Sequence, residues 1–112
     1  MKSQLAIVLK KIRQVFPDRD AKEILTSLEA YGTESYETGK YRVYLAILKL
    51  CDEERLSDPS SYIKAAKQDF RDVVAWAEYP NQMKFGPARD PKESAKLIKQ
   101  DAEQYQAWLK KT

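Results

Sequence analysis

From Tyr41 to Cys51 the sequence reads YRVYLAILKLC. Wound at about 100° per residue, this stretch is apolar around almost its whole circumference, because only Arg42 and Lys49 share a narrow polar line. A helix of this kind is normally enclosed by other helices. We therefore predict a central, buried helix that is capped by Thr38 and runs through Cys51.

The composition is typical of one folded domain. The chain has 112 residues, of which 43% are hydrophobic and 33% are charged. Three glycines and five prolines leave little material for turns, so long regular elements must dominate. We expect a single helical domain that covers residues 1–112.

Two amphipathic segments precede the central helix. Residues 4–16 carry one apolar stripe and end before Pro17, although Leu5 to Leu9 alone is also compatible with a short strand. A second, short helix begins at Asp20, which together with Glu23 has the form of a capping box. Gly32 then stands where a left-handed residue commonly ends a helix, and residues 33–38 are expected to form a turn.

Two helices are predicted after the central one. Asp58-Pro59 and Asp90-Pro91 each combine a capping oxygen with a proline suited to the first helical turn. The fourth helix should run to Pro80, and residues 81–89 are expected to form an exposed loop. The fold predicted is therefore an all-α, compact single-domain bundle of about five helices, with the third helix central and buried.

The last helix has an apolar seam whose residues alternate in steps of three and four. Such a seam is suited to packing at a shallow angle against a partner helix. Its members are Ala95, Ile98, Ala102, Tyr105 and Leu109.

Several classes of chemistry are poorly represented in this sequence. It has no histidine, which is the commonest general acid or base and the commonest metal ligand. The lone Cys51 excludes an intrachain disulfide and is typical of a reducing compartment. We expect no cofactor, no metal and no membrane span, since the apolar run from Leu5 to Leu9 is too short, and we expect a cytoplasmic protein.

The fourth helix carries the strongest candidate for a binding surface. Tyr62, Asp69 and Trp76 follow one another at intervals of seven residues, which places aromatic rings and a carboxylate on one side. Tyrosine and tryptophan are favoured as interface anchors, and the last helix adds Tyr105 and Trp108. The alternative is that another helix of the same domain packs on these rings. We predict a non-enzymatic interaction or regulatory module that docks a protein partner or self-associates, with a homodimer as one form.

A nucleic-acid-binding helical protein is the alternative function. Tyrosines near the start of the central helix could stack on bases, and basic side chains nearby could contact phosphates. The candidate residues are Lys10, Lys11, Arg13, Lys40 and Arg42. The net charge of +3 is too small and dispersed to argue for DNA binding by itself. An enzyme that uses carboxylates, tyrosines or lysine ranks last, because no spacing along the chain indicates convergent catalytic groups.

One resemblance adds to this reading. The segments RDVVAWAEYP, residues 71–80, and YGTESY, residues 31–36, resemble short bacterial helical proteins that are uncharacterised. The resemblance covers the middle of the chain. It implies a small bacterial helical domain and carries no activity, ligand or site residue.

Overall fold

The computed structural model describes residues 4–33, 39–85 and 90–111, and these form six helices and no strand. The all-α prediction is confirmed. The helices are α1 (Gln4–Val15), α2 (Ala21–Leu28), α3 (Lys40–Glu54), α4 (Ser60–Glu78), α5 (Pro80–Phe85) and α6 (Pro91–Lys110). No helix within the described ranges is long and apolar enough to cross a membrane.

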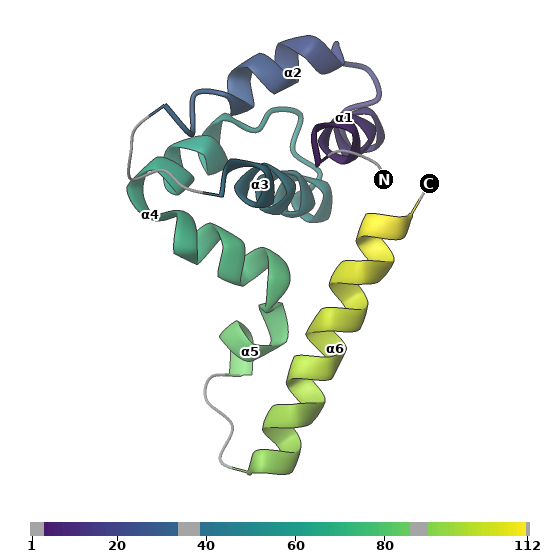
Figure 1. The fold of residues 1–112 in the computed structure, drawn as a ribbon, viewed down its shortest axis with the longest axis vertical. Coiled ribbons are helices and arrows are strands. Elements are labelled where there is room, and N and C mark those ends of the chain that lie inside the picture. The colour runs from purple at the N-terminus through teal and green to yellow at the C-terminus, as the bar shows by residue number, and fades with distance from the viewer. Residues whose placement is uncertain (1–3, 34–38, 86–89, 112) are drawn as a thin grey trace.

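The central position of α3 is confirmed. Eight of its residues are buried, among them Val43, Ile47 and Leu48, and α3 packs chiefly against α4 and α1. The buried set continues through Val8 and Ile12 of α1, so the core lies where α1, α2, α3 and α4 meet (Figure 1). Residues 41–51 are apolar on almost all sides, and the neighbouring helices exclude water from them, as expected.

Lys49, which shares the narrow polar line of α3 with Arg42, is buried. Only 2% of its surface is exposed, and its ammonium pairs with Glu53 one turn later. A buried ammonium requires such a partner, because desolvation without one is costly. The expected cap at Thr38 lies outside the described residues, and Gly39 precedes α3 in a left-handed conformation (φ 60°) that suits glycine.

The predicted aspartate caps are confirmed for α2 and α6. Asp20 and Asp90 accept hydrogen bonds from the backbone N–H groups of Lys22 and Lys92. Asp58 accepts from the N–H of Ser60 at 2.7 Å, but Pro59 occupies the N-cap position of α4 rather than its first helical position. A hydrogen bond with the Ser60 side chain, and then the one from its backbone N–H, lower the pKa of the Asp58 carboxyl group. The second half of the capping box is not formed, because Glu23 pairs with the Arg19 guanidinium instead.

Helix α4 is kinked, which the sequence pattern did not predict. Asp69 has extended backbone angles (φ −158°, ψ 96°), and its Oδ1 accepts from both the backbone N–H and the Nε of Arg71. An aspartate side chain that bonds to the backbone two residues later competes with helical hydrogen bonding. Asp69 therefore caps the second half of α4, and the helix changes direction there (Figure 1).

The prediction of a loop at residues 81–89 is wrong for residues 81–85, because Pro80–Phe85 forms α5. Pro80 ends α4 but is also suited to the first position of the next helix. Asp101 of α6 accepts from the backbone N–H groups of Asn81 and Gln82, so it caps α5 from another element. The described ranges therefore contain six helices rather than the five predicted.

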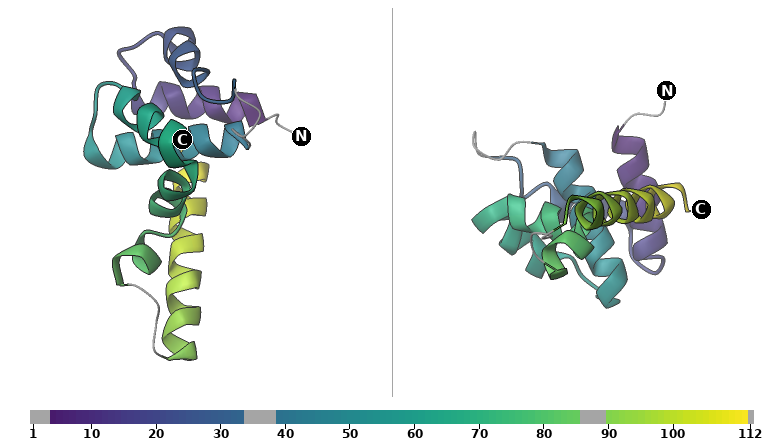
Figure 2. Two further views of the ribbon diagram at one scale, coloured as in Figure 1. Left: turned by 90° about the vertical axis from the view of Figure 1, so that its left-hand side faces the viewer. Right: turned by 90° about the horizontal axis from the view of Figure 1, so that it is seen from below.

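Helices α5 and α6 extend away from the body formed by α1 to α4. Figure 2 shows the first half of α6 projecting beside α5, while the last turns of α6 return toward the body. The molecule is accordingly longer than it is wide, at 45 × 32 × 29 Å. Helix α6 therefore borders one groove on each of two sides, instead of packing along its whole length against the other helices.

Candidate binding cleft

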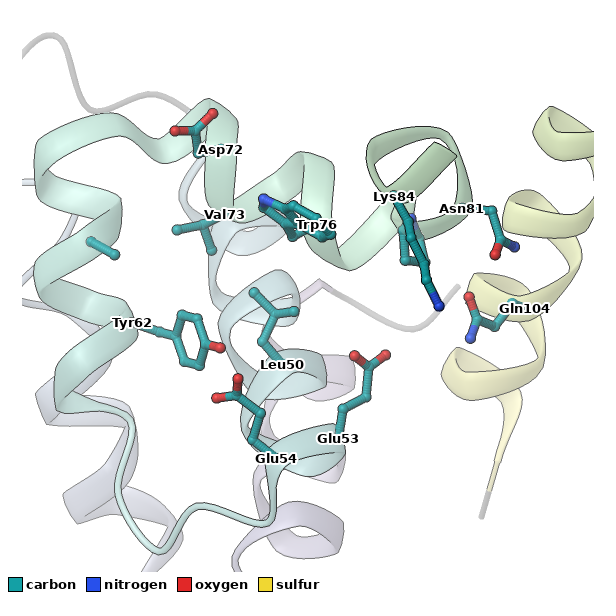
Figure 3. A pocket seen from close by; sticks show the side chains of 12 residues that line it. Leu50, Glu53, Glu54, Tyr62, Asp72, Val73, Trp76, Asn81, Lys84 and Gln104 are labelled. Carbon is teal, nitrogen blue, oxygen red and sulfur yellow. The ribbon is translucent and has the colours of Figure 1, made fainter. Parts of the chain in front are cut away.

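A cleft of about 530 Å³ opens where α3, α4 and α5 approach the middle of α6. Its size is within the range of sites that hold small ligands or the side chains of a docked peptide. Figure 3 shows side chains from all four helices around it. They are Leu50, Glu53, Glu54, Tyr62, Ala65, Asp72, Val73, Trp76, Pro80, Asn81, Lys84 and Gln104.

The floor of this cleft is apolar and aromatic. Leu50 of α3 lies beneath the ring of Trp76 of α4, and Val73 lies one turn before Trp76 (Figure 3). Leu50 and Val73 are buried, whereas 45% of Trp76 is exposed. An indole in this position offers a large apolar face at little conformational cost.

The rim of the cleft is acidic. Glu53 and Glu54 come from the last turn of α3, and Asp72 comes from α4. Lys84 also lines the cleft, and Glu53 is paired with the buried Lys49. Even with both lysines included, three carboxylates face two ammonium groups, so the cleft favours a positively charged ligand.

Tyr62 is fixed at one end of the cleft. Burial and a hydrogen bond to Glu54 raise the pKa of the Tyr62 hydroxyl well above its usual value. In Figure 3 this hydroxyl points toward the Glu54 carboxylate. The phenol therefore stays protonated, and Glu54 is held in place at the rim.

The structure brings only two of the predicted partner-binding residues together at this cleft. Tyr62 and Trp76 both line it, but Asp69 lies apart because the kink removes it from their line. Asp69 instead caps the second half of α4 through Arg71. The regular interval of seven residues fails here because the helix is not continuous.

Tyr105 and Trp108 form a separate cluster that attaches α6 to the body. Their ring centroids are 6.1 Å apart, and Trp108 Nε1 donates to Asp52 of α3 at 3.0 Å. Burial raises the pKa of Tyr105 to about 12. These two aromatic residues therefore pack within the domain, which was the alternative interpretation of the aromatic pattern.

Lys11 completes this cluster and is fully buried. Its ammonium donates to the backbone carbonyls of Trp108 and Lys111 and to Gln14 Oε1, and lies 4.5 Å from the centre of the Trp108 ring. Burial, followed by the charge of Lys10, lowers the pKa of Lys11. Lys11 thus caps the last turn of α6, where cations are favoured by the helix dipole.

The basic residues considered for nucleic-acid binding have different environments. Lys11 is buried, and Arg42 forms two hydrogen bonds with Glu78 at 2.7 and 2.8 Å. Arg13 on α1 is exposed, Lys10 is half-buried, and Lys40 lies 5.1 Å from the centre of the Tyr41 ring. Two of the five cations, Lys11 and Arg42, are therefore hydrogen-bonded within the domain, and a third, Lys40, lies over an aromatic ring.

Neither a metal centre nor a reactive thiol is found among the described residues. No three of their cysteine, aspartate and glutamate side chains are placed to hold a metal ion. Cys51 is buried in the core, and burial raises its pKa to about 12. A thiol in that state is a packing residue rather than a nucleophile.

Sequence reasoning missed three side chains that line the cleft or support the helices around it. Glu53 and Glu54 reach the cleft from α3, and no local spacing links them to Trp76 on α4. Asp101 is the buried residue of α6, although an aspartate was expected to face solvent. A signal was available for Asp101, because it lies on the same helical face as Leu97 and Trp108.

Comparison with known proteins adds no further constraint, since the chain matches no protein-family model, no curated protein and no solved structure.

Proposed function

We propose that this protein is a non-enzymatic helical interaction module whose cleft binds a basic segment of a protein partner. The observation that carries the proposal is the exposed indole of Trp76 beside the carboxylates of Glu54 and Asp72. A large apolar surface that remains open in a folded chain is typical of a protein-binding site. The acidic rim specifies the charge of the partner.

The chemistry of recognition follows from the geometry of the cleft. A lysine or arginine side chain placed over the Trp76 ring would gain a cation–π interaction of about 0.5–2 kcal/mol. Its charged head would lie within reach of the acidic rim, and an apolar neighbour in the same segment would pack on Leu50 and Val73. Tryptophan and tyrosine recur as the residues that dominate such interfaces.

A defined probe tests the proposal. The probe is a fluorescently labelled 14-residue amphipathic peptide with leucine on one face and lysine on the other, and its counterpart carries glutamate in place of lysine. We expect the lysine peptide to bind the cleft with an affinity that falls as salt is added. Fluorescence anisotropy measures the affinity, and chemical shifts of the Trp76 indole N–H locate the site.

Two substitutions of exposed aromatic residues form a matched pair. Trp76→Ala should weaken binding of the lysine peptide by at least tenfold, which corresponds to about 1.4 kcal/mol. Tyr79→Ala, which removes a ring of 41% exposure that does not line the cleft, should leave the affinity unchanged. Equal losses in both variants, or undiminished binding by Trp76→Ala, would contradict the proposal.

Self-association is the competing use of the same surface. A stable dimer needs about 800 Å² of buried surface on each partner, so it would cover Trp76 in the protein alone. Sedimentation velocity over a range of concentrations detects this state. A dimer that dissociates in Trp76→Ala would assign the cleft to a second copy, whereas a monomer leaves it open to a different partner.

A further inference from the structure

Helix α6 presents an apolar stripe away from the body. Its side-chain hydrogen bonds to the rest of the chain come from Asp101 and Trp108, on a face displaced by one residue from the stripe. Ala95 and Ala102 of the predicted seam are exposed, and Ile98 is 51% exposed. The first three members of the predicted seam therefore face solvent, whereas Tyr105 packs against Trp108 within the domain.

This stripe continues into a second groove, of about 620 Å³, between α1, α3 and the last turns of α6. Leu109 belongs to the same helical face as Ala95 and Ala102, and it lines the groove with Ile7 and Leu45. All three lining residues are aliphatic and partly exposed. Figures 1 and 2 show the end of α6 approaching the body at this place.

The border of this surface is basic. Lys10 and Lys110 line the groove, and Lys92 and Lys99 stand along the same edge of α6. The exposed acid along that edge, Glu103, lies 4.0 Å from the Lys99 ammonium. The edge therefore carries an excess of positive charge around an aliphatic strip.

We propose that this basic stripe and groove bind an acidic amphipathic helix of a partner protein. The distance from Ala95 to Leu109 along α6 is about 21 Å, which matches a helix of about 14 residues. The small side chains of Ala95 and Ala102 allow a second helix to approach closely, with Ile98 and Leu109 as apolar anchors. Acidic residues on its flank would pair with Lys10, Lys99 and Lys110.

A second copy of this chain is a poorer occupant of the stripe. In an antiparallel two-fold pair, the first turn of one α6 meets the last turn of the other. That arrangement brings Lys92 of one copy toward Lys110 of its partner, and like charges in such positions oppose association. The charge pattern therefore favours a different, acidic molecule.

The proposed site is separate from the acidic cleft. Gln104 faces that cleft from α6, whereas Gln106 and Leu109 line the basic groove on another side of the helix. The two surfaces have opposite charge and different apolar anchors. One molecule could accordingly hold a basic segment and an acidic helix on two sides of α6.

The test uses the glutamate form of the 14-residue leucine peptide, with the lysine form as its control. We expect the glutamate peptide to bind and to shift the methyl resonances of Ile98 and Leu109. Ile98→Glu and Lys110→Glu should each weaken its binding by at least tenfold, whereas Lys64→Glu, an equal charge change on α4, should not. Circular dichroism checks that each variant remains helical.

The outcomes separate this proposal from the one made for the cleft. Trp76→Ala should leave binding of the glutamate peptide unchanged, and Lys110→Glu should leave binding of the lysine peptide unchanged. Failure of the glutamate peptide to bind, or binding that survives both Ile98→Glu and Lys110→Glu, would overturn the proposal. Concentration-dependent dimerisation that Ile98→Glu abolishes would assign the stripe to a second copy instead.

Discussion

Lys11 is the residue whose environment departs most from that of its type. Lysine is almost never fully buried unless it is paired, and here its partners are carbonyl and amide oxygens. The ammonium lies over the Trp108 ring, while the Trp108 N–H is bonded to Asp52. A cation, an aromatic ring and a carboxylate thus join α1, α3 and α6 at one point.

We predict that Lys11→Ala lowers the free energy of unfolding by about 2–3 kcal/mol, because hydrogen bonds from a charged donor to the end of α6 are lost. Urea denaturation followed by circular dichroism measures the change. Arg13→Ala is the control on the same helix, and its exposed side chain should contribute less than about 0.5 kcal/mol. Similar values for the two variants would show that Lys11 does not hold α6.

At the scale of single elements, the helices could be predicted where their signals are local. The apolar periodicity of α1 and α3 and the aspartates before α2 and α6 act within a few residues of the chain. The kink at Asp69 was missed because an aspartate inside a helical pattern can either point to solvent or bond to the nearby backbone and interrupt the helix. The spacing of the apolar residues does not distinguish these two possibilities.

Helix α5 and the orientation of α6 depend on long-range interactions, among them the one made by Asp101, and could not be predicted. Asp101 lies about twenty residues after the N–H groups that it caps, so no sequence window contains both. With Asp101 buried, the face of α6 that carries Asp101 and Trp108 packs inward, and Ala95, Ile98 and Ala102 are exposed. The candidate cleft was only partly predicted, because its residues come from different helices. Tyr62 and Trp76 share α4 and could be related by their spacing, whereas Glu53 and Glu54 belong to α3.

Asp101→Ala should unfold α5 and lower the free energy of unfolding by about 1–3 kcal/mol, because two backbone N–H groups and the Gln82 amide lose their acceptor. A helix of six residues is too short to persist without such support. Hydrogen exchange at the amides of Asn81 and Gln82 measures the local effect. Glu103→Ala, an exposed acid on the same helix, should leave both amides as protected as before.

At the scale of the whole molecule, the domain consists of a packed body and a projecting arm. The body encloses α3 among α1, α2 and α4, and the arm consists of α5 with the first half of α6 (Figures 1 and 2). Isoleucine occurs in both regions, at Ile47 in the core and at Ile98 on the arm. The same substitution at these two positions therefore measures how differently the two regions contribute to stability.

Ile47→Ala should lower the free energy of unfolding by about 2–5 kcal/mol, since its side chain is fully buried and the cavity left behind cannot fill with protein atoms. Ile98→Ala should change it by less than about 0.5 kcal/mol, because half of that side chain already contacts solvent. Thermal and urea denaturation of both variants provide the comparison. A small loss at Ile47 would mean that water reaches α3 and that the other helices do not enclose it. A large loss at Ile98 would mean that the stripe on α6 is covered in solution, and the acidic helix proposed for it would then have to displace another occupant.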